Sequence, residues 1–284
     1  MIGHNAYVND LVALCLEPFH NLFHSPSQSI VDIVKLLIDN GADPDFVDER
    51  GLTFLHRAAE FLTPELYDKL IMYFDSSGRK DAFKMLTPTN QSHLHISVEN
   101  FQPLQTTLDI FKSNVIDFNG LDSDGESVVF VAIRSGRNAE FISTLFNYGS
   151  DWMISDKKEN NPLHVAALYE NISALKLFIS LGCDVNAKNI MRRTPLHNSL
   201  LSEIQHDTFL LNEGEHIQSE YDIVELLTKE SVDITAKDIN DTVGFLPLVP
   251  KLLDSFRTNG FLGFYSLFDS FSTGLWWHDE IVEK

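Results

Sequence analysis

Cysteine is scarce in this sequence, and long hydrophobic runs are absent from it. The 284 residues include two cysteines, Cys15 and Cys183, which lie in apolar segments without Cys-x-x-Cys spacing. That arrangement favours buried free thiols over a disulfide framework or a zinc site. No apolar run approaches the roughly 20 residues of a membrane-spanning helix. Residues 1–5 have neither a basic flank nor an apolar signal core, so we expect neither secretion nor membrane insertion.

Basic residues are also few. There are 21 Lys and Arg residues against 41 Asp and Glu residues, which gives a formal net charge of −20. The longest basic clusters are the pairs Arg79 with Lys80, Lys157 with Lys158, and Arg192 with Arg193. Direct nucleic-acid binding is therefore disfavoured, because a phosphate backbone is repelled unless a basic stripe overrides the overall charge. Two explanations of the acidity stay open, namely solubility and attraction of a basic protein partner.

Catalytic and ligand-binding motifs are missing as well. The sequence has no Gly-rich phosphate loop and no nucleophile elbow. His20 and His24 have the spacing of two zinc ligands on a helix, but a Glu beside the first His and a third ligand are lacking. Residues 122–125 begin like a calcium loop, yet its twelfth position is Ile133 instead of Glu. We predict no enzyme activity, no cofactor and no metal, and we assign residues 122–125 to a hairpin turn.

An internal repeat dominates what the sequence does contain. Five times an Asp is followed five residues later by Asp or Asn. The pairs are Asp43/Asp48, Asp117/Asp122, Asp151/Asp156, Asp184/Asn189 and Asp233/Asp238. Self-similarity at a period of roughly 33 residues is typical of a solenoid, in which one small unit buries its apolar face only by stacking on its neighbours.

A second motif, made of variants of Thr-Pro-Leu-His, follows most of these pairs. It occurs in residues 53–59, 92–95, 127–132, 161–167 and 194–197. Between the copies run apolar helices that end in Gly-containing turns, such as residues 33–43 and 175–186. This pattern resembles the ankyrin repeat over about residues 29–240. The resemblance implies an all-α repeat solenoid, an ankyrin-repeat stack of about six helix pairs with short β-hairpin loops.

Each motif residue has a physical role in that fold. Thr or Ser caps backbone N–H groups at the helix start, and Pro at the first helical position has no N–H group to satisfy. Gly41, Gly149 and Gly182 stand where a helix stops in the left-handed conformation. Asp side chains accept hydrogen bonds from turn N–H groups. Phe130 replaces His in the third copy, so we expect packing to hold that turn.

The motif histidines lie on the same turn as the cap. They are His56, His95, His164 and His197. The ankyrin resemblance implies that each imidazole ties its turn to the neighbouring loop. We therefore predict a structural role for these histidines rather than a catalytic one.

Two segments depart from the repeat. Residues 75–87, before Ser92, form a lengthened loop without the paired Asp, so the sequence leaves open whether this unit stacks on its neighbours. An insertion near 202–220 separates the two helices of the last unit and carries several acids but no Lys or Arg. It is predicted to be either a solvated loop or an acidic docking element.

The two ends are expected to close the stack. We assign residues 1–240 to the solenoid, whose N-terminal unit is degenerate and serves as a cap. Residues 241–284 are rich in aromatic side chains and form either a helical C-terminal cap or a partner-binding segment. Residues 246–253 are faintly similar to the Leu-Pro openings of F-box-like segments, although Pro250 would interrupt the helix those segments require. A substrate adaptor for a ubiquitin ligase is therefore the alternative function.

Recognition of a protein is the function that the resemblance implies. Ankyrin hairpin tips and first helices line a concave binding face, so we predict a non-catalytic scaffold, inhibitor or effector. The candidate partner-binding residues are Phe46, Glu49, Arg50, Phe61, Ser123, Asp124, Lys157, Lys158, Tyr169, Ile190, Met191 and Arg192. We expect a protein partner, with no direct nucleic acid and no membrane, and a basic partner is one of the options that stay open. A cytoplasmic location is expected; the nucleus, or a host's cytoplasm for a pathogen effector, stays open, as does the oligomeric state.

Overall fold

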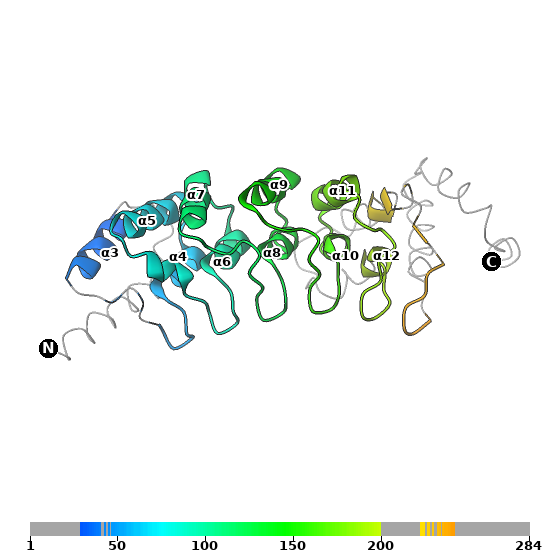
Figure 1. Ribbon diagram of the computed structural model, residues 1–284, viewed down its shortest axis with the longest axis horizontal. Coiled ribbons are helices and arrows are strands. Elements are labelled where there is room, and N and C mark those ends of the chain that lie inside the picture. The colour runs from blue at the N-terminus through cyan, green and yellow to red at the C-terminus, as the bar shows by residue number, and fades with distance from the viewer. Residues whose placement is uncertain are drawn as a thin grey trace, which may run out of the picture. The chain divides into compact units, whose positions relative to one another are not determined.

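Short helices and hairpin loops alternate along the chain. The computed structural model describes residues 29–199, except 41, 42, 44 and 46, and residues 222–241, except 225, 228, 230, 231 and 234. The helices are α3 (Ser29–Asp39), α4 (Phe54–Phe61), α5 (Pro64–Ser76), α6 (His93–Asn100), α7 (Gln105–Ser113), α8 (Val128–Arg134), α9 (Ala139–Tyr148), α10 (Pro162–Leu168), α11 (Ile172–Ser180) and α12 (Pro195–Ser199), with a 3-10 helix η1 (Lys80–Lys84) (Figure 1). None of these helices is long and apolar enough to cross a membrane.

Several predictions fall outside the described residues. They concern the N-terminal cap, Gly41, Phe46, the acidic insertion near 202–220, and the C-terminal segment with its F-box-like stretch. The boundary at residue 240 stays a prediction for the same reason. Contacts divide the chain into two compact units, residues 1–157 and residues 158–284, which we call unit one and unit two.

In unit one the helices form two layers. The short helices α4, α6 and α8 pack on one another, and the outer helices α3, α5 and α7 do the same. Figure 1 shows these two rows, with the hairpin loops beyond the row of α4, α6 and α8. In unit two, α10 packs against both α11 and α12. The predicted stack of helix pairs is confirmed.

Capping side chains start the inner helices as the sequence predicts. Thr53, Ser92 and Asn161 each accept a hydrogen bond from the backbone N–H three residues later, where the motif His stands. In return, the imidazole Nδ1 accepts a hydrogen bond from the N–H of the capping residue. This is a capping box with His where Glu or Gln is usual. The motif Leu side chains that follow are fully buried. Where Phe130 replaces His, Ser127 makes no capping bond and Phe130 is fully buried, so packing does hold that turn.

The lengthened loop at residues 75–87, which lies in unit one, does stack on its neighbours. Thr87 takes the place of the missing Asp, and its Oγ1 accepts a hydrogen bond from the N–H of Gln91 at 3.0 Å. The extra residues form η1, which buries Phe83. That ring lies 6.5 Å from Phe74 of α5 and 6.0 Å from Phe111 of α7, measured between centroids. The insertion therefore fills the space between two outer helices, and aromatic packing offsets the irregular spacing.

Six hairpin turns share one backbone feature. The fourth residue of each turn has positive φ. These residues are Gly51, Asn90, Gly125, Glu159, Arg192 and Asp241. A side chain at Gly125 would also meet the neighbouring loop, since an added Cβ would lie 2.9 Å from the Lys157 nitrogen. The described residues contain an isolated bridge between Val47 and Thr53 but no strand, so the hairpins are tight turns rather than β-ladders.

Candidate protein-interaction surface

Asp and Asn side chains fix the backbone of several hairpin tips. Asp48 Oδ1 accepts hydrogen bonds from the N–H groups of Arg50 and Leu52 at 2.8 and 2.9 Å. Asp122 and Asn189 make the same pair of bonds in their own turns, at 2.9 to 3.0 Å. The first Asp of each sequence pair likewise accepts from the N–H two residues on. The predicted role of these carboxylates in the turns is confirmed.

Main-chain hydrogen bonds link successive tips. In unit one, Ser123 N donates to Thr89 O at 2.8 Å, and Lys157 N donates to Asp124 O at 3.3 Å. The side chain of Lys157 also folds back, because its Nζ donates to Ser123 O at 2.6 Å. The candidates Ser123, Asp124 and Lys157 thus hold the stack through backbone atoms while their side chains are exposed.

Unit two repeats this linkage. Ile190 N donates to Lys158 O at 3.0 Å, and Ile239 N donates to Met191 O at 3.1 Å. The candidates Lys158, Ile190 and Arg192 are exposed, whereas Met191 is half-buried. Tyr169 is half-buried at the end of α10, away from these turns in sequence.

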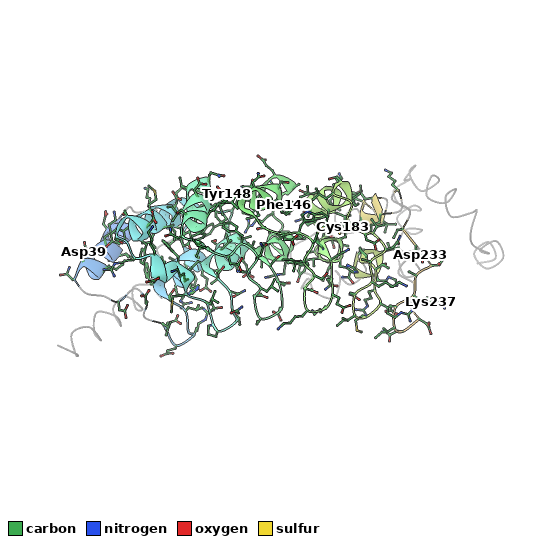
Figure 2. All side chains as sticks on the ribbon, viewed as in Figure 1. Asp39, Phe146, Tyr148, Cys183, Asp233 and Lys237 are labelled. Atoms are coloured by element: carbon green, nitrogen blue, oxygen red, sulfur yellow. The ribbon has the colours of Figure 1, made fainter. Side chains whose placement is uncertain are left out.

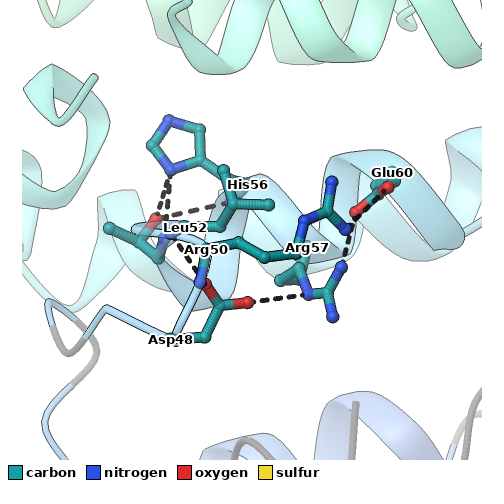
Figure 3. Close-up of polar contacts among 7 residues, drawn as sticks. Asp48, Arg50, Leu52, His56, Arg57 and Glu60 are labelled. Atoms are coloured by element: carbon teal, nitrogen blue, oxygen red, sulfur yellow. Dashed lines mark hydrogen bonds and ion pairs between the residues drawn. The ribbon is translucent and has the colours of Figure 1, made fainter. Parts of the chain in front are cut away.

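The first tip joins an ionic network (Figure 3). Arg57 Nε lies 3.1 Å from Asp48 Oδ2, and Arg57 Nη1 lies 2.9 Å from Glu60 Oε2. Arg50 Nη1 reaches the other Glu60 oxygen at 3.4 Å. The Arg57 guanidinium also lies over the ring of Phe61, 5.3 Å from its centroid. The structure thus connects two candidates, Arg50 and Phe61, through a pair that the sequence analysis did not single out.

Three further tip residues were missed from the sequence. Lys188 and Lys237 precede the turns that begin at Asn189 and Asp238, and Ile239 occupies the same position in its turn as Ile190. Figure 2 shows Lys237 on the last described hairpin loop. Aligning the repeats on the second Asp or Asn of each pair would have found all three.

The motif histidines have a structural environment. His164 Nε2 lies 2.8 Å from Arg193 O in the next loop, so the predicted tie between turn and loop is confirmed for His164; for the other motif histidines it stays a prediction. Desolvation by burial lowers the pKa of His56 to about 4, so its imidazole is neutral at physiological pH. Burial likewise lowers the pKa of His95. These rings serve as neutral hydrogen-bonding partners of the caps.

Side chains that could hold a metal ion do not cluster in the described part of the chain. No three His, Cys, Asp or Glu side chains there lie close enough to hold a metal ion. Burial raises the pKa of the half-buried Cys183 thiol to about 11, so the reactive thiolate is scarce at physiological pH.

Comparison with known proteins agrees with this geometry. A family model described as ankyrin repeats (3 copies) matches residues 94–189 and 129–238. The chain is 26% identical over 172 residues to SH3 and multiple ankyrin repeat domains protein 2 of Homo sapiens, covering 61% of this chain and 9% of that protein. It is 35% identical over 172 residues to putative ankyrin repeat protein FPV233 of Fowlpox virus (strain NVSL), covering 60% of this chain and 31% of that protein.

A solved structure shares the fold. The ankyrin repeat domain of Bcl-3, a member of the IkappaB protein family, superposes with a TM-score of 0.52 at 19% identity, covering 76% of this chain and 86% of that one. The stack of helix pairs described above is thus shared with a protein of known fold. This chain belongs to the ankyrin-repeat family of protein-interaction domains.

Proposed function

We propose that this chain is a non-catalytic recognition module that binds a protein partner through its hairpin tips, as a scaffold, an inhibitor or an effector in the cytoplasm. The main-chain links between tips are the observation that carries this proposal. They order the tip backbones without using the exposed side chains, so binding costs little conformational entropy. A rigid array of this kind suits recognition of a folded surface or an extended segment.

A matched pair of variants tests the proposal. The tip variant carries Glu49→Ala, Asp124→Ala, Ile190→Ala and Arg192→Ala. The control carries Glu65→Ala, Glu140→Ala, Met72→Ala and Lys176→Ala on the outer helices. Both variants remove two acids, one base and one exposed apolar side chain.

Immobilised wild-type protein and both variants are used to capture proteins from a lysate of the source cells, with circular dichroism to verify folding. We expect a stoichiometric protein that the wild type and the control retain and the tip variant loses. Equal capture by the tip variant, or loss confined to the outer-helix control, would place binding elsewhere. Turnover of a small molecule by the purified protein would also contradict a non-catalytic role.

Two finer predictions depend on residues outside the described part of the chain. The ubiquitin-ligase adaptor alternative rests on residues 246–253, and the acidic docking element rests on residues 202–220. Both stay predictions. The same capture experiment bears on the first, because recovery of ligase components by the wild type and by a chain ending at residue 241 would remove the reason to invoke residues 246–253.

A further inference from the structure

Three successive hairpin tips of unit two carry exposed cations. Lys158 stands in the first turn, Lys188 and Arg192 flank the second, and Lys237 precedes the third. The protein as a whole has a formal net charge of −20, so this concentration of positive charge runs against the composition. We call the four cations, together with Ile190 and Ile239, the basic tip surface.

The spacing of these cations is fixed. The hydrogen bonds from Ile190 N to Lys158 O and from Ile239 N to Met191 O hold each tip beside the next. Arg193 adds an ion pair between tips, with its Nε 3.5 Å from Asp238 Oδ2. Because Asp238 is only 4% exposed, its charge is used inside the stack rather than on the surface.

In and next to the turns the exposed cations outnumber the exposed acids, and the loops carry two more exposed acids, Asp184 and Asp233, outside the turns. Glu159 and Asp241 are exposed in the fourth, left-handed position of their turns, against four exposed cations. Asp184 and Asp233 lie earlier in the loops, where their Oδ1 atoms accept hydrogen bonds from the N–H groups of Asn186 and Thr235.

Apolar side chains stand among the cations. Ile190 is 52% exposed and Ile239 is 50% exposed. Both occupy the residue directly after the Asn or Asp that begins the turn, on tips joined by a hydrogen bond. Half-exposed isoleucines between lysines and an arginine form a surface of mixed chemistry, whose complement carries negative charge and apolar groups together.

We propose that the basic tip surface of unit two binds an acidic segment of the partner protein, one in which Asp or Glu residues alternate with apolar residues. This proposal rests on the proposed function and names the class of partner. A nucleic acid fits less well, because the isoleucines offer nothing to a phosphate backbone and the net charge of −20 repels a long polyanion. Single-strand binding also draws on exposed aromatic side chains, and the described tips of unit two have none.

The test uses the full chain and labelled probes in fluorescence anisotropy. The probe is a fluorescein-labelled peptide of three Asp-Leu-Glu-Ile repeats. Comparison probes are a peptide of three Asp-Ser-Glu-Ser repeats and an oligothymidylate of twelve nucleotides. The test variant carries Lys188→Glu, Arg192→Glu and Lys237→Glu. The control carries Lys69→Glu, Lys80→Glu and Lys84→Glu in unit one, which changes the net charge equally.

We expect the Asp-Leu-Glu-Ile peptide to bind the wild type and the control alike, and the test variant at least about tenfold more weakly at physiological ionic strength. The serine peptide should bind at least about fivefold more weakly than the Asp-Leu-Glu-Ile peptide, since it cannot cover the isoleucines. Raising the salt concentration should weaken peptide binding by the wild type far more than peptide binding by the test variant, because exposed charges are screened over about 8 Å.

Three results would overturn the proposal: equal binding by wild type and test variant, tighter binding of the oligothymidylate than of the peptide, or no measurable binding of the acidic peptide. These results leave the proposed function intact if lysate capture still depends on the tips. Capture that does not depend on the tips, with the acidic peptide bound as predicted, would instead contradict the proposed function alone.

Discussion

The two units have the same hairpin turns but differ in the side chains that precede them. In unit one the residue before the turn is apolar and exposed in three loops, at Val47, Leu86 and Leu121. In unit two the same position holds Lys188 and Lys237. Because the backbone geometry of the turn is shared, folding does not dictate these side chains. This change from apolar to basic side chains is the difference on which the acidic partner proposed for unit two rests.

The first residues of the inner helices differ as well. Unit two begins α10 and α12 with Pro162 and Pro195, whereas unit one begins α6 with His93. His93 is fully buried, its Nε2 lies 2.9 Å from Ala82 O of η1, and its ring stacks on His56 with centroids 3.8 Å apart. An insertion and a buried imidazole pair thus replace a proline, and we expect them to make unit one sensitive to acid.

The largest expected effect comes from truncating the motif leucines. Leu94→Ala in unit one and Leu163→Ala in unit two each remove a fully buried side chain, so each should cost about 2 to 5 kcal/mol of unfolding free energy. Urea unfolding followed by circular dichroism measures the cost. If the units unfold separately, each variant should shift one transition and leave the other. Unchanged unfolding in both variants would mean that the repeat register is wrong.

Acid should destabilise unit one next most strongly. The folded-state pKa of His56 is about 4, below the ordinary value of 6.5, so the unfolded chain binds this proton more readily. Stability is therefore fully present above about pH 6.5 and is lost as the pH falls toward 4, by about 3 kcal/mol from His56 alone. Burial also lowers the pKa of His93, which adds to the loss.

A double variant isolates the histidine pair. His56→Gln keeps a capping-box side chain, and His93→Pro introduces the residue that α10 and α12 have at this position. We expect this variant to fold at neutral pH and to show a flatter fall in stability between pH 6.5 and 4. If the stability of the wild type and of the double variant falls equally with pH, the histidine pair is not the cause of acid sensitivity in unit one.

Two glycines offer a smaller, matched comparison. Gly125 in unit one has positive φ, and an added Cβ would lie 2.9 Å from Lys157 N, whereas Gly182 in unit two has positive φ with nothing within 4 Å. Gly125→Ala should cost about 2 kcal/mol or more, from backbone strain plus steric overlap, and Gly182→Ala about 1 kcal/mol from strain alone. Thermal melts of both variants would rank them. Equal costs would mean that the loops do not approach as closely as described.

Much of this architecture is predictable because it depends on residues a few positions apart. The caps at Thr53 and Asn161 and the Asp turns follow from local hydrogen bonds. Thr87 in place of Asp was not recognised, because a hydroxyl that accepts the same N–H has no consensus match. The burial of Phe83 between α5 and α7 depends on helices far apart in sequence, which local patterns do not report.

The exposed residues of the hairpin tips were predicted less completely, and their part in binding stays a prediction. Glu49, Arg50 and Ile190 lie in the turns themselves and were found from the repeat. Lys188 and Lys237 lie one residue before their turns, outside the turn positions that were considered, although aligning the repeats on Asn189 and Asp238 brings them to the same position.

The smallest expected effect is a gain in stability. Val115 follows α7 in unit one with a φ of 60°, where Gly182 stands after α11 in unit two, and its side chain is 85% exposed. A β-branched residue is strained there, so Val115→Gly should raise the unfolding free energy by about 1 kcal/mol. Val115→Ala keeps a Cβ and serves as the control. A melting temperature that falls in the glycine variant would show that Val115 contributes more through contacts than it costs in strain.

The links between tips also bear on how this protein can change over time. At positions 123, 157, 190 and 239 the hydrogen-bond donor is the peptide N–H, which every residue except proline possesses. Nineteen of the twenty amino acids can therefore keep the link, whatever their side chains. Substitutions at these positions can accumulate or be selected without loss of the scaffold. If a partner's surface changes, side chains at the tips can change to match it while the fold stays the same.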